Sequence, residues 1–318
     1  MVMRLQDIAE LAGVSPSTVS RVFSNNPRIS PAVRSRVLEL AAQYDYHPRL
    51  SPRDRNIVIL IPDAQEYPAH YCVEMLVMAL SAALSAANFR VEMLPWNNRS
   101  RLEKLQFYGA AAVGLEASEL ADWPERFVQP LVVLDREMPD GLRGVWQVSS
   151  DEYQCMELAA EHFRVAGRKR VGVLIYGTKG CGNSDLRMAA AKAALMKFGF
   201  PREEGLFAYA SEESSVAEVG RMLQRKVDAL LCPGHSGGLL TAYALQLFNK
   251  RIPEDIALIS SEICFYSPYA IPPQTTFCPD YPRLARAAAA VFNAVLWGKK
   301  VPARTIVPCR LLARASVR

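Results

Sequence analysis

The chain has 318 residues and a formal net charge of +5, with 50% hydrophobic and 22% charged residues. This supply of apolar side chains excludes a wholly disordered protein, and the length predicts two or three domains. No signal-peptide pattern opens the sequence and no run of 18 apolar residues occurs, so we expect a cytoplasmic protein that does not contact membranes.

Residues 1–49 predict a small domain of three helices. Apolar positions at helical spacing over 5–12 indicate the first helix, and Gly13 tolerates the positive φ of a sharp turn after it. The pair Ser15-Pro16 is an N-cap and first-turn signal for a second helix, and Ser30-Pro31 repeats this signal for a third. A shared apolar core among the three helices follows.

The polar side chains of the second predicted helix have the chemistry for reading DNA. Small residues at its start allow close approach to base edges, and Arg21 one turn later can donate to guanine O6 and N7. Residues 1–55 contain eight Arg and no Lys against five acidic residues, which gives this segment +3 and favours phosphate contact. The alternative is that the three helices form only a structural cap.

The string L-Q-D-I-A-E-L-A-G-V-S-P-S-T-V-S-R-V-F at 5–23, followed by R-I-S-P-A-V-R-S-R-V and Y-H-P, resembles the lactose/galactose repressor family. This resemblance implies a helix-turn-helix domain that binds a double-stranded DNA operator. In that family the positions that match Pro16, Ser17 and Arg21 face bases. The positions that match Ser15, Thr18, Ser20, Asn25 and Arg34 lie near phosphates.

A short linker, placed at residues 50–56, follows the predicted DNA-binding domain. Only fifteen residues separate Tyr46 from Pro62, several fewer than the family usually has. In relatives this region holds a hinge helix that inserts a leucine into the minor groove. Leu50 is the candidate here, although Pro52 opposes a helix.

From residue 57 to residue 318 the pattern changes to short apolar runs that alternate with Ala-rich helical stretches. Strands are predicted at I-V-I-L-I, V-E-M-L, A-A-A-V-G-L, L-V-V-L, V-G-V-L-I, L-F-A-Y, D-A-L-L-C and I-A-L-I-S, and helices at about 72–87, 185–198, 214–225 and 237–249. This rhythm indicates an α/β fold with parallel sheets. Landmarks such as R-I-P-E-D-I-A-L-I-S resemble the core of the same family, which implies a periplasmic-binding-protein-like core of two Rossmann-like lobes with an effector in the cleft.

The candidate effector residues depart from the family pattern. Arg187 matches the arginine that usually holds the ligand, but the usual Asn-Asp pair is replaced by Gly234 and His235, and the aspartate expected after I-A-L-I-S is replaced by Ser261 beside Glu262. Tyr67 is a further candidate for effector contact. For Tyr67, as for Trp96, the alternative is an ordinary role in the packing of the lobe. The loss of acceptors argues against an ordinary free sugar, and an acidic or phosphorylated metabolite held by Arg187 at a helix start is a second possibility.

Two motifs suggest enzymes and are rejected. G-H-S-G-G at 234–238 fits G-x-S-x-G, but every histidine lies upstream of Ser236, whereas the hydrolase triad needs one downstream. The glycines at 177–182 lack the Lys-Ser/Thr of a phosphate loop. The seven cysteines show no metal-ligand spacing, so we expect reduced, mostly buried thiols, no metal and no cofactor.

The sequence therefore predicts a transcription regulator, most simply a repressor, that binds a pseudo-palindromic operator as a homodimer and responds to a small-molecule effector. No catalysis is expected. The alternative is a regulator whose core has lost small-molecule binding and acts as a scaffold for dimerisation or protein docking.

Overall fold

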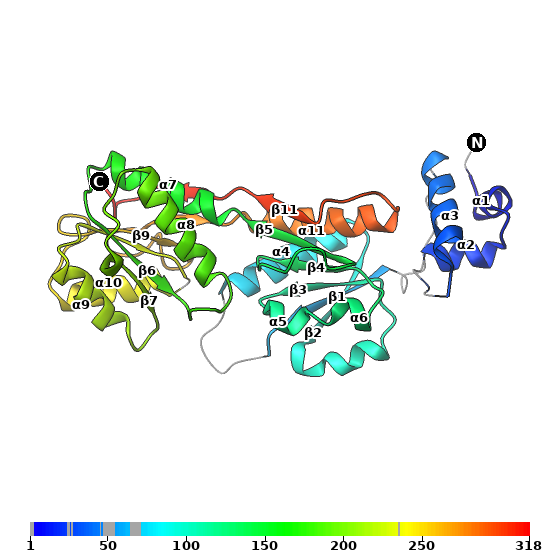
Figure 1. Ribbon diagram of the computed structural model, residues 1–318, viewed down its shortest axis with the longest axis horizontal. Coiled ribbons are helices and arrows are strands. Elements are labelled where there is room, and N and C mark those ends of the chain that lie inside the picture. Colours follow the sequence, from blue (N-terminus) through cyan, green and yellow to red (C-terminus); the bar gives the residue numbers. More distant parts are fainter. Residues whose placement is uncertain are drawn as a thin grey trace. The chain divides into compact units, whose positions relative to one another are not determined.

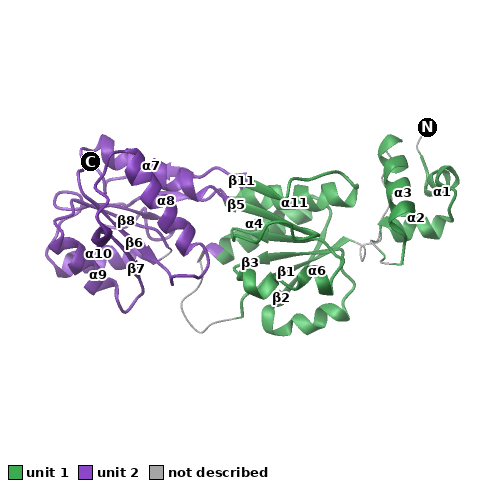
Figure 2. Cartoon of the chain, in the orientation of Figure 1, with its two compact units in different colours: residues 1–69, 73–149, 281–305 green, residues 70–72, 150–280, 306–318 purple. Residues whose placement is uncertain are grey.

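The computed structural model describes residues 3–23, 26, 28–44, 46, 55–63, 71–234 and 236–318 (Figure 1). Within them the chain forms an N-terminal group of helices and two α/β lobes, as the sequence predicts. By their internal contacts the residues divide into two compact units, drawn in different colours in Figure 2. Unit 1 consists of residues 1–69, 73–149 and 281–305, and unit 2 of residues 70–72, 150–280 and 306–318.

The three N-terminal helices match their sequence signals. They are α1 (Leu5–Ala12), α2 (Pro16–Phe23) and α3 (Pro31–Gln43). Gly13 has φ 66°, which confirms the predicted turn, and the Ser30 hydroxyl accepts a hydrogen bond from the Val33 amide. Ile8, Val19 and Val37, one from each helix, meet in a common core with no exposed surface.

The sheet of unit 1 has six strands in the order β11-β5-β4-β3-β1-β2. The strands are β1 (Asn56–Ile61), β2 (Arg90–Pro95), β3 (Gly109–Val113), β4 (Leu131–Leu134), β5 (Val145–Ser150) and β11 (Arg304–Val307). The helices that accompany them are α4 (Tyr71–Ala86), η2 (Trp96–Glu103), α5 (Ala117–Leu120), α6 (Trp123–Arg126) and α11 (Tyr281–Leu296). Strands β1 to β5 run parallel, as expected for β-α units.

The sheet of unit 2 repeats this arrangement in the order β12-β10-β9-β8-β6-β7. Its strands are β6 (Val171–Tyr176), β7 (Phe207–Ala210), β8 (Ala229–Cys232), β9 (Ala257–Ser261), β10 (Thr275–Cys278) and the antiparallel β12 (Arg310–Leu312). Its helices are α7 (Glu152–Val165), α8 (Ser184–Lys197), η3 (Glu204–Leu206), α9 (Ser215–Gln224) and α10 (Gly237–Leu247).

Alternate residues of β6 explain why this sheet is covered on both faces. Val173 and Ile175 pack in a core with α7 and α8, whereas Leu174 and Tyr176 pack in a second core with α9 and α10. Because successive side chains of a strand point to opposite faces, a strand covered on both sides needs an unbroken apolar run. The V-G-V-L-I-Y sequence of β6 meets that need.

The expectation that all cysteines are reduced and mostly buried is wrong. Cys155 and Cys309 form a disulfide with a Cα–Cα distance of 5.8 Å, and of the five free cysteines only Cys232 is buried. The pair lies 154 residues apart in sequence and is brought together where the Asp151 amide donates to the Val307 carbonyl. A contact at this separation leaves no spacing signal in the sequence.

In the part of the chain that the structure describes, no helix combines the length and the apolar character needed to cross a bilayer.

Candidate DNA-reading face and effector site

Helix α2 separates an apolar face from a polar one. Val19, Val22 and Phe23 are at most 2% exposed and pack in the helical core. Ser17, Ser20 and Arg21 are exposed on the remaining surface, together with Ser15 and Pro16 at the start of the helix. The residues predicted to face DNA therefore share the surface that does not pack inside the domain.

The start of α2 is fixed by a small hydroxyl cluster. The Ser15 Oγ accepts a hydrogen bond from the Thr18 amide at 3.1 Å, and it lies 2.8 Å from Ser17 Oγ and 2.9 Å from Thr18 Oγ1. This is the N-cap that the sequence predicts, with Pro16 as the first helical residue. The N-terminus of the helix, as the positive end of its dipole, is a favourable place for a phosphate oxygen.

Arg34 has a supporting position in the structure. Its Nη1 donates to the Val22 carbonyl at 3.2 Å and its Nη2 donates to the Asn26 carbonyl at 2.7 Å. Burial lowers the pKa of the Arg34 guanidinium from its ordinary value. The side chain thus holds the C-terminal end of α2 from α3.

Four of the predicted site residues, Asn25, Leu50, Tyr67 and His235, lie outside the described residues.

The remaining effector candidates lie in unit 2, beside the carboxyl ends of β6, β8 and β9. The strand order in each lobe reverses beside its first strand, and open α/β sheets bind ligands at the carboxyl ends of strands at such a point. Ser261 ends β9, and its hydroxyl accepts a hydrogen bond from the Gly234 amide in the loop after β8 at 3.1 Å. Two of the predicted positions are therefore in direct contact.

Arg187, in the first turns of α8, is paired with an acidic residue of α7. Its Nε and Nη2 both lie 2.8 Å from Glu152 Oε1, and the Glu152 side chain is only 4% exposed. The Arg187 side chain is 22% exposed, so its charge is largely compensated before any ligand arrives. Glu152 could not be predicted as a site residue from the sequence, because a partner 35 residues away leaves no local pattern.

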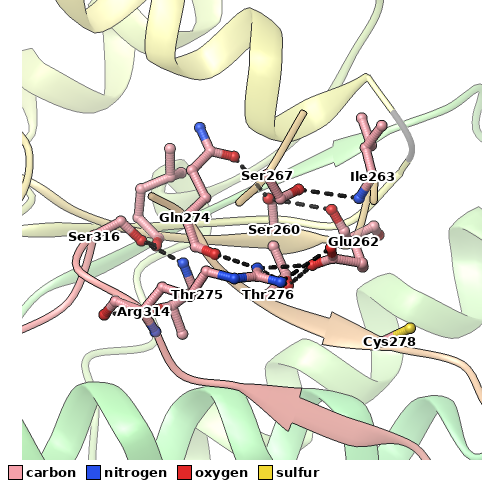
Figure 3. Close-up of polar contacts among 12 residues, drawn as sticks. Ser260, Glu262, Ile263, Ser267, Gln274, Thr275, Thr276, Cys278, Arg314 and Ser316 are labelled. Atoms are coloured by element: carbon pink, nitrogen blue, oxygen red, sulfur yellow. Dashed lines mark hydrogen bonds and ion pairs between the residues drawn. The ribbon is translucent and has the colours of Figure 1, made fainter. Parts of the chain in front are cut away.

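Glu262 belongs to a buried polar network around β9 and β10 (Figure 3). Arg314 donates from Nη1 to Glu262 Oε2 at 2.8 Å and from Nη2 to Oε1 at 3.1 Å, so the two side chains form a fork. Nη1 also donates to the Gln274 carbonyl at 2.6 Å, and the Thr276 hydroxyl donates to Glu262 Oε2. Both carboxylate oxygens of Glu262 are thus engaged within the fold.

The glycines of G-H-S-G-G serve close packing. At Gly234, φ is +113° and a Cβ would lie 2.3 Å from the Tyr176 carbonyl oxygen. A Cβ at Gly238 would lie 2.4 Å from Ser260 Oγ. At these two glycines the loop after β8 and the start of α10 approach β6 and β9 too closely for a side chain, which explains the motif without a nucleophile.

Two family models match the chain. Residues 4–49 match "Bacterial regulatory proteins, lacI family", and residues 160–317 match "Periplasmic binding protein-like domain". The first match covers the three N-terminal helices and the second covers most of unit 2.

Similar proteins extend the comparison to nearly the whole chain. The transcriptional regulator CelR of Thermobifida fusca is 24% identical over 98% of this chain and 97% of its own. The solved CelR–cellobiose complex has a TM-score of 0.71 at 23% identity and the lac repressor dimer bound to operator and the anti-inducer ONPF has 0.69 at 19%, each over 99% of both chains. These structures share the fold described above.

Proposed function

Because the chain belongs to the LacI family of bacterial regulatory proteins, we propose that it regulates transcription by inserting α2 into the major groove of a pseudo-palindromic operator. DNA reading is assigned to residues 1–49, and effector response and dimerisation to the core from residue 57. Repression is the proposed outcome of operator binding.

One observation carries this proposal: the exposed side of α2 displays Ser17, Ser20 and Arg21, while its other side is fully used in packing. Short hydroxyl side chains permit close approach to base edges, and Arg21 can donate two hydrogen bonds to guanine. Ser15 and Thr18 at the helix start supply donors for the adjacent phosphate.

The test is selection of DNA sequences from a random library with the purified protein at physiological salt. Wild type should enrich a palindrome, and Arg21→Ala should lose preference at one position per half-site, which corresponds to about 1–3 kcal/mol. Arg90→Ala removes the same charge from an exposed site outside the reading domain and should leave the palindrome unchanged.

An equal loss of binding in both arginine variants would indicate a purely electrostatic interaction and would contradict sequence reading by α2.

Dimerisation is assigned to an exposed aromatic surface of unit 2. Tyr243 and Leu247 of α10 are more than half exposed, and Tyr269 and Ile271, in the segment between β9 and β10, are 80% and 99% exposed. Tyr243, Tyr269 and Ile271 line a common groove. An apolar aromatic patch of this kind is typical of a protein interface. We assign a second copy of the chain as its occupant, because a palindromic operator requires two reading domains and the similar lac repressor binds its operator as a dimer.

The proposed effector site comprises Arg187 with Glu152, and Ser261 with the loop after β8. Because Glu152 compensates the charge of Arg187, this site offers paired donors and acceptors rather than net positive charge. We therefore assign a neutral hydroxylated metabolite as effector, in preference to a phosphorylated one. Glu262 contributes indirectly, by holding the strand that ends in Ser261.

A core without a small-molecule ligand is the second candidate, and the internal pairing of both Arg187 and Glu262 favours it. A thermal-shift panel of sugars, sugar phosphates and nucleosides separates the two candidates, because a ligand at 100 times its Kd stabilises by about 2.7 kcal/mol. A shift that is lost in Arg187→Met and kept in Arg251→Ala supports the effector site. No shift across the panel supports the scaffold.

We propose no catalytic role, since the glycines that resemble a nucleophile elbow are explained by packing. We also propose a cytoplasmic location, because the operator DNA of a bacterial regulator lies in the cytoplasm.

A further inference from the structure

The end of α11 contacts the DNA-reading helices within unit 1. The ring of Trp297, the residue after α11, lies 5.9 Å from the Phe23 ring at an interplanar angle of 62°. At the next residue, Gly298, a Cβ would lie 2.9 Å from Leu38 Cδ1 of α3. The contact thus joins both α2 and α3 to the end of one core helix.

The Trp297 ring completes the core of the reading domain. The ring packs against the apolar cluster that contains Ile8, Val19 and Phe23. Within this cluster the ring centroids of Phe23 and Tyr46 are 6.1 Å apart. Edge-to-face aromatic pairs of this geometry add about 0.5–1.5 kcal/mol beyond the area that they bury. The Trp297 Nε1 donates to Asn293 Oδ1 of α11 at 3.2 Å, which orients the indole on its helix.

Beneath the contact, α11 is anchored in the lobe. Phe292 is fully buried and lies 6.2 Å from Phe89, which stacks on Tyr108 at 6.2 Å. Burial raises the pKa of the Tyr108 phenol, and the positive charge of Arg34 on α3 lowers it in part.

The contact leaves the reading face free. Phe23 is the last residue of α2 and lies on its buried side, whereas Ser17, Ser20 and Arg21 are exposed. A reading domain held in this way keeps its DNA-facing residues accessible.

We propose that Trp297 and Gly298 form a seat that holds the reading domain on its own core in the DNA-free protein, so that the domain tumbles with the core. In relatives a hinge helix lies between the reading domain and the core. The shorter linker of this chain makes a direct contact the alternative way to hold the domain on the core. Trp297 is then a positioning residue, and α11, roughly 24 Å long, connects the seat to Tyr281, the first residue of this segment of unit 1.

Backbone NMR of the full-length protein without DNA or ligand tests the proposal. If the seat holds the reading domain, the backbone amides of residues 5–43 should have the fast transverse relaxation and broad signals of a large protein that tumbles as one body. Trp297→Ala should release them as sharp signals whose dispersion shows that the three helices remain folded. Trp96→Ala, a partly buried tryptophan of the same unit that contacts Arg99, should leave them broad. Sharp signals in wild type, or no change in Trp297→Ala, would overturn the proposal.

Disulfide trapping provides a second measurement that does not depend on removing Trp297. In the doubly substituted Leu38→Cys/Gly298→Cys protein, mild oxidation should join the two positions. A Cβ at Gly298 would lie 3.1 Å from Leu38 Cβ, and a shift of a few tenths of an ångström brings the pair to the Cβ–Cβ distance of a disulfide, about 3.5–4.5 Å. Glu39→Cys/Gly298→Cys is the control, since Glu39 is exposed one position further along α3. Equal rates of cross-linking in the two proteins would contradict the seat. Both measurements are made without DNA. Their outcomes therefore do not depend on whether the operator selection succeeds.

Discussion

Removing Arg314 tests whether Glu262 is held chiefly by the fold. The two side chains are 19% and 6% exposed and form two hydrogen bonds of 2.8 and 3.1 Å. In Arg314→Met the Glu262 carboxylate stays buried without its counter-charge. Breaking one side of a buried pair costs about 3–5 kcal/mol, and we expect Arg314→Met to destabilise unit 2 by that amount.

The double variant Arg314→Met/Glu262→Leu should be less destabilised than Arg314→Met alone. Both charges are then gone, and the remaining cost comes from the Gln274 carbonyl and the Thr276 hydroxyl, which lose a donor or an acceptor. An unsatisfied buried polar group costs about 1–3 kcal/mol. The sign of the difference between single and double variants is therefore the critical result.

Hydrogen exchange of the amides in β9 and β10 is the suitable assay, because a protein of two lobes need not unfold in one step. Arg251→Ala is a matched control: Arg251 forms a similar fork with Asp255, with two bonds of 3.1 Å, but its side chain is 72% exposed. Exposed pairs contribute little, so exchange should hardly change. A double variant that exchanges as fast as Arg314→Met would refute the argument from an unpaired charge.

Four further predictions follow from single contacts. Arg34→Ala removes hydrogen bonds to the end of α2, should destabilise the reading domain by about 1.5–3 kcal/mol in chemical unfolding, and should weaken binding to all DNA sequences alike. Gly234→Ala should lower the Tm far more than Gly180→Ala, because both have positive φ but only Gly234 meets the Tyr176 carbonyl; equal losses would mean that strain alone decides. Alkylation in denaturant should label five cysteines without reductant and seven after reduction, whereas seven at once would exclude the Cys155–Cys309 bond. Burial lowers the pKa of His162, so the unfolded chain takes up its proton first and stability should fall as pH drops below about 6.5; in His162→Gln this part of the pH dependence should disappear.

The N-terminal helices could be predicted almost to the residue because their signals are local. One or two residues mark each helix terminus: Gly13 ends α1, the Ser15-Pro16 pair begins α2, and the Ser30-Pro31 pair begins α3. Eight strands, β1 to β4 and β6 to β9, were predictable for a similar reason, since each is a short apolar run between polar turns. The strands β5, β10, β11 and β12 were not predicted, because their sequences mix polar and apolar residues. The family resemblance was therefore supported by physical signals at both ends of the chain.

Helix α11 was not predicted, although a signal exists. Leu284, Ala288 and Phe292 are buried at a spacing of four residues within an Ala-rich stretch, which is the pattern of an amphipathic helix. The partners of Glu262 and Arg187 had no such signal. They are 52 and 35 residues away and meet only after the sheet of unit 2 has assembled. Whether a candidate ligand residue is already occupied within the fold therefore cannot be read from spacing.

The interleaving of the two units also affects how the protein folds during synthesis. Unit 1 lacks α11 and the edge strand β11 until the ribosome has added the intervening segment 150–280 of unit 2. At about 5–20 residues per second those 131 residues take roughly 7–26 s. During that time the nascent sheet has no Phe292 to cover Phe89, and the first three helices have no Trp297 beside Phe23. The first lobe to emerge must therefore wait for nearly the last part of the chain, and an apolar surface that a chaperone can bind stays open throughout that wait.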